Sequence, residues 1–232
     1  MSESSASLTQ VVLQEVIAHI RDNGLRLGDP LPSEGDIAAK VGVSRTVVRE
    51  AFGALSALNL IDVGNGRRAR VGMVNASVMS LPMSHAVDTA QATVSQVWDA
   101  RRALECRTAE LAAMRRTKAE AQAILEHARA LRRAGADLAV QTEHDIAFHG
   151  AIASATRNPV FSLLIASFAN VMRQTCPIGW LSRRTESDRL AVFDQHDRIA
   201  EAISAGDPAA AQVAMDAHFE LSLRALTKSG FN

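Results

Sequence analysis

The amino-acid sequence predicts a mostly α protein with two parts, a small N-terminal domain and a larger helical one. The chain has 232 residues, which is more than one average domain. Hydrophobic residues make up 47% of it, aromatic residues only 4%, and tyrosine is absent, a composition that favours packed helices over sheets. Apolar side chains also recur at helical spacing along most of the sequence.

An amphipathic helix is predicted first, over residues 9–23. Val12, Val16 and Ile20 are four residues apart and form one apolar stripe along this segment. Gly24 is a natural stop, because glycine readily adopts the left-handed conformation that ends a helix.

Two further helices are predicted next, joined by a turn that contains glycine. Ser33 with Asp36 can cap a short helix, Gly42 marks a tight turn, and Ser44 can cap a second helix that runs to about Leu58. This arrangement is a helix-turn-helix, whose second helix can enter the major groove of DNA.

The outward side of the second helix carries residues that suit contact with DNA. Ser44, Arg45, Thr46 and Arg49 are polar, while the apolar residues of the same helix point inward. An arginine near the start of a recognition helix can reach phosphates or pair with a guanine edge, which gives about 1 to 3 kcal/mol of discrimination. From helix periodicity alone, a solvated arginine face is the favoured alternative.

A basic hairpin after this helix shifts the balance toward DNA binding. Asn65-Gly66 is a strong signal for a two-residue turn, and Arg67 is the first of three arginines just past its tip. Between residues 44 and 72, five arginines stand against two acids, although the whole chain is balanced with 25 basic and 25 acidic residues. A basic hairpin after a helix-turn-helix is typical of a winged helix.

The C-terminal two-thirds is predicted to be a bundle of about six helices with short turns. Local signals mark its helix ends after residue 93: Thr117 with Glu120, Asp137, Asn158-Pro159, and Gly206-Asp207. The helix from Asn158-Pro159 is expected to reach about Cys176, before a loop that contains Pro177 and Gly179. We therefore expect a winged helix-turn-helix at residues 1–73, a mixed linker at 74–92 and the bundle at 93–232.

Four side chains of the bundle are candidates for binding a divalent metal ion. Asp145 and His149 are four residues apart and share one helix face. His196 lies 10 residues before Gly206 and His218 lies 12 after it, so two antiparallel helices would bring both to the same level. Three imidazoles and one carboxylate suit Zn²⁺, with Ni²⁺ or Mn²⁺ as alternatives. Spacing alone favours a metal and an ordinary hydrogen-bonded core equally.

The N-terminal motif resembles that of the GntR family of bacterial transcription regulators. The similar stretch is "LRLGDPLPSEGDIAAKVGVSRTVVREAFGALSALNLIDVGNG". The resemblance implies DNA contacts from Ser44, Arg45, Thr46, Arg49 and, at the wing tip, Gly66, beside which Arg67 is a further candidate. Many relatives have an arginine after "LPSE", where this chain has Gly35, so one contact that is common in the family is absent.

The C-terminal part resembles the FCD effector domain of the FadR-type GntR subfamily over roughly residues 93–228. The resemblance is carried by "DIAFH" at residues 145–149, together with His196 and His218. In metal-binding members these positions are the ligands, which implies a site of Asp145, His149, His196 and His218.

The segment "WDARRALE" is similar to the element that opens the FCD domain, with Asp99 in place of the usual glutamate. By position, Arg101 would point into the pocket. A buried arginine beside a cation is costly unless an anion joins them, so we expect an effector that carries a carboxylate. Arg173 is the second candidate for binding this effector, and a surface salt bridge is the alternative for both arginines.

These features predict a DNA-binding regulator controlled by a small organic or sugar acid at a metal site. It would act as a homodimer on a pseudo-palindromic operator in double-stranded DNA. A pure metal sensor is one alternative. The other is a metal-dependent hydrolase of the helical HD type, suggested by His144-Asp145 and His196-Asp197, but it leaves the winged helix unexplained. We therefore expect no enzyme activity.

The location of the protein is predicted from the segments that the sequence lacks. No apolar run approaches the roughly 20 residues that span a bilayer, and the polar start "MSESSASLTQ" is unlike a signal peptide. We therefore expect a cytoplasmic protein without a membrane partner, whose Cys106 and Cys176 are reduced thiols.

Overall fold

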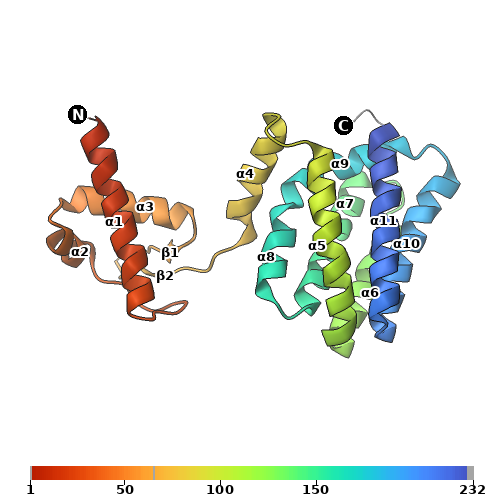
Figure 1. Cartoon of the computed structure of the whole chain (residues 1–232), viewed down its shortest axis with the longest axis horizontal. Coiled ribbons are helices and arrows are strands. Elements are labelled where there is room, and N and C mark those ends of the chain that lie inside the picture. The colour runs from red at the N-terminus through yellow and green to blue at the C-terminus, as the bar shows by residue number, and fades with distance from the viewer. Residues whose placement is uncertain (1, 65, 229–232) are drawn as a thin grey trace. The chain divides into compact units, whose positions relative to one another are not determined.

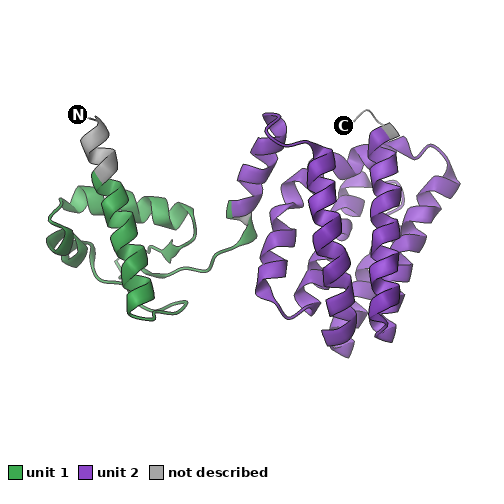
Figure 2. Cartoon of the chain, in the orientation of Figure 1, with its two compact units in different colours: residues 1–78 green, residues 79–232 purple. Residues whose placement is uncertain are grey.

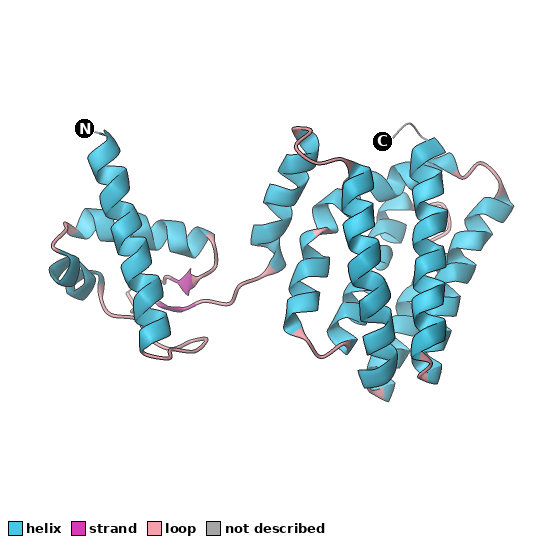
Figure 3. Cartoon of the chain, in the orientation of Figure 1, coloured by secondary structure: helices cyan, strands magenta, loops and turns pink. Residues whose placement is uncertain are grey.

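The computed structural model describes residues 2–64 and 66–228 and contains two compact units, Met1–Val78 and Met79–Asn232 (Figure 2). Helices make up most of both units, and the strands of the described residues form one small sheet (Figure 3). The mostly α class predicted from the sequence is confirmed. In this described part of the chain, no helix is both long and apolar enough to cross a membrane.

The first unit is a winged helix-turn-helix (Figure 1). Ser33 and Asp36 form the capping box of the second helix, and the hydroxyl of Ser44 caps the third, as predicted. Gly42 ends the second helix with a φ of 75°, a conformation that costs glycine least. The elements are α1 (Ser2–Asp22), α2 (Glu34–Val41), α3 (Arg45–Ala57), β1 (Ile61–Asp62) and β2 (Arg70–Val71).

The wing is held to the helices by backbone pairing and by a shared core. β1 and β2 are antiparallel, with Ile61 opposite Val71, and an isolated bridge joins Pro30 to β2. Residues 63–69 connect the two strands, so the predicted two-residue hairpin turn at Asn65-Gly66 is wrong; Gly66 has a φ of 71° in this longer connection, and Asn65 lies outside the described residues. The inward stripes of α1 and α3 bury one apolar cluster, which includes Val12, Val16, Val48, Phe52 and Leu55.

The second unit is a bundle whose long helices close into a ring (Figure 1). Around the ring, α5 packs against α11, α11 against α10, α10 against α6, α6 against α7, and α7 against α5. Phe148 and Ile152 are among the fully buried side chains of its core. The elements are α4 (Ala76–Asp88), α5 (Val94–Arg115), α6 (Lys118–Arg133), α7 (Leu138–Ala155), α8 (Pro159–Ser167), α9 (Ala169–Ser182), α10 (Glu186–Ala205) and α11 (Pro208–Lys228).

The segment predicted as a linker, residues 74–92, is mostly the helix α4. Pro82 lies inside this helix and cannot donate a backbone hydrogen bond, which is why an irregular segment was expected. Met83 and Val87 are one helical turn apart and pack against the core of the bundle. The burial of this stripe stabilises the helix despite the missing hydrogen bond.

The predicted loop at Pro177 and Gly179 is also wrong, because both residues lie inside α9. The helix expected from Asn158-Pro159 to about Cys176 is divided at Phe168 into α8 and α9. Thr175, Gly179 and Trp180 are buried on α9. Packing against the bundle therefore continues this helix past a residue that ends many isolated helices.

The buried core predicts a specific loss of stability for Ile152→Ala. Ile152 is 0% exposed, so truncating it leaves a cavity that should lower the free energy of unfolding by about 2 to 5 kcal/mol. Because Trp98 and Trp180 are the only tryptophans and both lie in the bundle, tryptophan fluorescence during denaturant unfolding reports this unit. Val213→Ala, at a side chain 69% exposed, is the control and should change stability by less than about 0.5 kcal/mol. Equal losses would contradict the assigned core.

Candidate functional site

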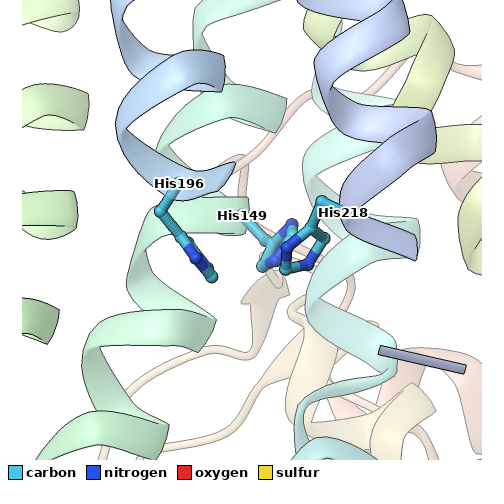
Figure 4. A group of neighbouring side chains, drawn as sticks. All are labelled: His149, His196 and His218. Atoms are coloured by element: carbon cyan, nitrogen blue, oxygen red, sulfur yellow. The ribbon is translucent and has the colours of Figure 1, made fainter. Parts of the chain in front are cut away.

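Three histidine side chains from three helices meet inside the bundle (Figure 4). His149 comes from α7, His196 from α10 and His218 from α11, and all three are buried. One ligand-capable atom from each lies within 4.8 Å of the others. The turn at Gly206 brings His196 and His218 together, with ring centroids 4.6 Å apart.

Asp145 joins this cluster from the helical turn before His149. Its Oδ1 atom lies 2.8 Å from His196 Nε2 and 3.9 Å from His149 Nε2. Burial alone would raise the pKa of the Asp145 carboxyl, but the hydrogen bond with His196 and the neighbouring imidazoles hold it well below its usual range. The carboxylate is therefore ionised and faces the histidines.

The hydrogen bonds of the histidines do not satisfy every ring nitrogen, so these nitrogens can bind a cation. Both ring nitrogens of His196 face oxygen acceptors at 2.8 Å, Val192 O at Nδ1 and Asp145 Oδ1 at Nε2. A neutral imidazole can donate through only one nitrogen, so a second proton or a cation is needed at the other. The Val192 carbonyl accepts a hydrogen bond from Nδ1–H, which orients Nε2 in the way that metal-binding histidines are commonly oriented.

The other two histidines also have nitrogens that no hydrogen bond satisfies. His218 Nδ1 is buried without a hydrogen-bond partner, and so is His149 Nε2. Burial, followed by the neighbouring histidines, lowers the pKa of His218 well below its ordinary value, so its ring is neutral and keeps a lone pair. With the Asp145 carboxylate, these donors fit a divalent metal ion.

Arg101 is buried beside the cluster, as the sequence predicted, but it already has an anionic partner. Its Nε donates to Glu105 Oε1 at 2.7 Å, and both side chains are at most 2% exposed. Glu105 Oε2 in turn contacts His149 Nδ1. The expectation that Arg101 requires an effector carboxylate as its counter-ion is therefore wrong, because Glu105 supplies the charge one helical turn away.

A small cavity adjoins the histidines. Its enclosed free volume is about 30 Å³, room for about one or two water molecules. Arg101 lines this cavity together with three of the four predicted metal ligands, Asp145, His196 and His218. A small metabolite therefore enters only if the side chains around the cavity move apart.

Arg173, the second predicted effector residue, lies away from this cavity. Its side chain is 46% exposed and its Nε donates to Glu143 Oε1 at 2.7 Å. The cavity is lined instead by Arg183, which the sequence analysis missed. Thr175, Gly179 and Arg183 are spaced four residues apart, so in a helix they lie on one face. The sequence analysis missed this face because it predicted a loop at Pro177.

The two HD dipeptides do not form a hydrolase-like site. Asp145 and His196 belong to the histidine cluster, but the side chains next to them in the sequence, His144 and Asp197, contact other residues. His144 lies beside His127, with ring centroids 6.0 Å apart, and Asp197 pairs with Arg132 at 2.6 Å. Each dipeptide thus contributes one residue and not the adjacent pair that the hydrolase hypothesis requires.

The candidate DNA contacts lie on the exposed side of the winged helix. Arg45, Thr46 and Arg49 are exposed on α3, while Ser44 caps the helix through its hydroxyl. A surface hollow between the helices and the wing is lined by four arginines and a single glutamate: Arg45, Arg49, Arg67, Arg68 and Glu34. Gly66 also lines this hollow. The predicted residues other than Ser44 and Thr46 therefore share one basic surface.

Neighbouring residues of the first unit fix the positions of these arginine side chains. Arg49 pairs with Glu34 at 3.2 Å, and Arg67 pairs with Asp62 at 2.8 Å. A Cβ at Gly35 would lie 3.1 Å from Nη2 of Arg45, so the glycine leaves room for this guanidinium. The departure at Gly35 from the common family pattern thus changes the position that Arg45 can occupy.

Comparison with known proteins gives two domain matches and several relatives that match most of this chain. The sequence matches the gntR family of bacterial regulatory proteins over residues 8–71 and the FCD domain over residues 96–221. It is 33% identical to the HTH-type transcriptional regulator LutR of Bacillus subtilis (strain 168), over 86% of this chain and 92% of that protein. It is 29% identical to the Glc operon transcriptional activator of Escherichia coli (strain K12), over 94% of this chain and 88% of that protein.

A solved structure supports the fold. Streptococcus agalactiae GntR superposes with a TM-score of 0.67 at 24% sequence identity, and the match covers 93% of this chain and 98% of that one. At this identity, the match supports the fold alone.

The buried pair of Arg101 and Glu105 predicts a large effect of Glu105→Gln. Removing the carboxylate leaves the guanidinium buried without its counter-ion, so the bundle should lose about 3 to 5 kcal/mol of unfolding free energy. Glu110→Gln breaks the Arg107–Glu110 pair on the same helix, where Arg107 is 53% exposed, and should cost less than about 1 kcal/mol. Denaturant unfolding followed by tryptophan fluorescence measures both. A loss below 1 kcal/mol for Glu105→Gln would show that Arg101 finds another partner.

Proposed function

Because this chain belongs to the gntR family of bacterial regulatory proteins and carries an FCD domain, it is a transcription regulator, and we propose that a divalent metal ion and a small carboxylate effector control its affinity for DNA. Its family and relatives are regulators and not enzymes, which removes the hydrolase hypothesis. The observation that carries the proposal is the buried convergence of His149, His196 and His218 with nitrogens that lack partners.

The metal ion would be held by Asp145, His149, His196 and His218. Three imidazoles and a carboxylate favour Zn²⁺, and Ni²⁺ or Mn²⁺ can use the same donors. When bound, the ion supplies a fixed positive charge that attracts a carboxylate. His149 and His196 are oriented for this role through Glu105 and the Val192 carbonyl.

The effector would occupy the cavity beside this cluster. Because the free volume is only about 30 Å³, the lining side chains must move apart to admit the effector, which favours a small organic or sugar acid. The cavity is lined by residues of α5, α7, α9, α10 and α11, so a bound acid contacts several helices of the ring. If the acid binds one packing of these helices more tightly, it shifts the population toward that packing.

DNA would be bound by a homodimer on a pseudo-palindromic operator. Two copies of α3 can read half-sites about one DNA turn, 34 to 36 Å, apart. Effector coupling of about 1 to 3 kcal/mol would change operator affinity 5- to 150-fold. A regulator of bacterial genes works where the chromosome is, so we propose that the chain acts in the cytoplasm.

Two substitutions should separate metal binding from DNA binding. His196→Ala should lose the metal, measured by elemental analysis of purified protein, because a buried ligand is removed, and should still bind the operator. Arg49→Ala should keep the metal and lose at least about tenfold in affinity for an operator selected from random DNA, measured by fluorescence anisotropy. His127→Ala, outside the cluster, and Arg21→Ala, on α1, are the matched controls.

Metal content unchanged by His196→Ala would remove that histidine from the site. Full operator affinity in Arg49→Ala would remove that arginine from the DNA surface. A pure metal sensor is distinguished by a further titration, in which organic and sugar acids are added to metal-saturated protein on DNA. Affinity that responds to the metal but to no acid would identify the ion itself as the signal.

A further inference from the structure

Arg183 is a buried cation that no carboxylate contacts directly in the described part of the chain, although Asp145 and Asp188 attract it from beyond ion-pairing distance. The residue is only 9% exposed, and no ion pair or side-chain hydrogen bond joins its guanidinium to any residue in the described ranges, 2–64 and 66–228. Its guanidinium carbon lies 5.1 Å from the ring centroid of Trp180, so the indole face holds the group in place. Arginine stays protonated in proteins, so this side chain carries a full positive charge.

The contrast with Arg101 shows what Arg183 lacks. Both arginines are buried and both line the cavity beside the histidines, yet only Arg101 has a carboxylate, Glu105, within hydrogen-bonding distance. The nearby carboxylate of Asp145 is already engaged by His196 and by the thiol of Cys176. Asp188 attracts Arg183 only from beyond ion-pairing distance. A buried charge without a contacting counter-ion is unfavourable, so an anion that enters and contacts Arg183 stabilises the site.

Arg183 also lies where the cavity meets the surface. A separate hollow outside the cavity is lined by Arg183, Arg184 and Arg189 with Glu186. Trp180 and Arg183 line both spaces. An anion that approaches through the hollow therefore meets positive charge before it reaches the histidines.

The charges around the cavity point to a ligand with two negative charges. A divalent ion bound by Asp145 and three neutral histidines leaves one positive charge at that end. Arg101 and Glu105 neutralise each other, and Arg183, which Asp188 offsets only from beyond ion-pairing distance, contributes a second positive charge at the other end. A monocarboxylate would satisfy only one of these charges.

We propose that Arg183 binds a second acidic group of the effector, and that the effector is therefore a small dicarboxylate. This inference rests on the proposed metal-anchored function. One carboxylate faces the histidine cluster, and the other accepts hydrogen bonds from the guanidinium that Trp180 orients. Arg101 and Glu105 stay paired and form part of the wall.

The test is a calorimetric titration of the metal-loaded protein with matched acids. Malonate, succinate and glutarate are each compared with the monocarboxylate of the same chain length: propionate, butyrate and pentanoate. The wild-type protein should bind one dicarboxylate at least about tenfold more tightly than its monocarboxylate partner, because the second carboxylate gains a charge-assisted bidentate pair. In Arg183→Gln this preference should disappear while the metal content stays unchanged.

Arg184→Gln is the matched control, because Arg184 is exposed and lines the outer hollow but not the cavity. This substitution removes the same charge from the next residue, and the variant should keep the preference for the dicarboxylate. Arg183→Lys keeps the charge but lacks the planar fork, and should retain part of the preference. Without acid, Arg183→Gln should melt no lower than wild type, since it removes an unpaired buried charge.

The outcomes separate this inference from the proposed function. Protein without bound metal would overturn the metal-anchored function. Metal-loaded wild type that binds no dicarboxylate, or binds mono- and dicarboxylates equally, would overturn the role of Arg183 alone. Equal losses in Arg183→Gln and Arg184→Gln would also overturn it, because they would indicate general electrostatic attraction.

Discussion

The interior of the bundle can hold ionised side chains because they contact one another in one continuous series. Arg101 donates to Glu105, Glu105 contacts His149, and the Asp145 carboxylate lies next to His149 and His196. These side chains are buried, and an unpaired charge in such a place costs several kcal/mol. Rotation of α5, α7 or α10 would break a link, so the series fixes how these helices face one another as well as the shape of the site.

This series is incomplete at one place, and that place adjoins the cavity. His218 Nδ1 and His149 Nε2 lack hydrogen-bond partners, and His196 has more acceptors around it than a neutral ring can satisfy. Buried polar atoms in native proteins nearly always have partners, so exceptions point to an ion or ligand. Since these histidines come from three helices, what binds them also affects how those helices pack, which is the physical basis for control of the DNA-binding half.

Local sequence signals predicted most of the helix ends and paired Asp145 with His149 and His196 with His218, while the resemblance to the FCD domain implied that the two pairs meet. The capping boxes at Ser33 and Thr117 formed because their hydrogen bonds lie within a few residues of one another. Two failed predictions, the linker at Pro82 and the loop at Pro177, share one cause. Proline weakens a helix locally, but each segment buries an apolar or small-residue stripe against the bundle, which sequence alone does not show.

By itself, the sequence determined the winged helix, the helical bundle and the spacing within the pairs Asp145–His149 and His196–His218, because caps, turns and a helical period of 3.6 residues act over short distances. Tertiary structure alone decided the partners of the buried charges. It gave Arg101 the carboxylate of Glu105, moved Arg173 to the surface beside Glu143, and left Arg183 unpaired at the cavity. Pairing between charges depends on how whole helices pack, since the distance and burial that set its strength are properties of the assembled bundle.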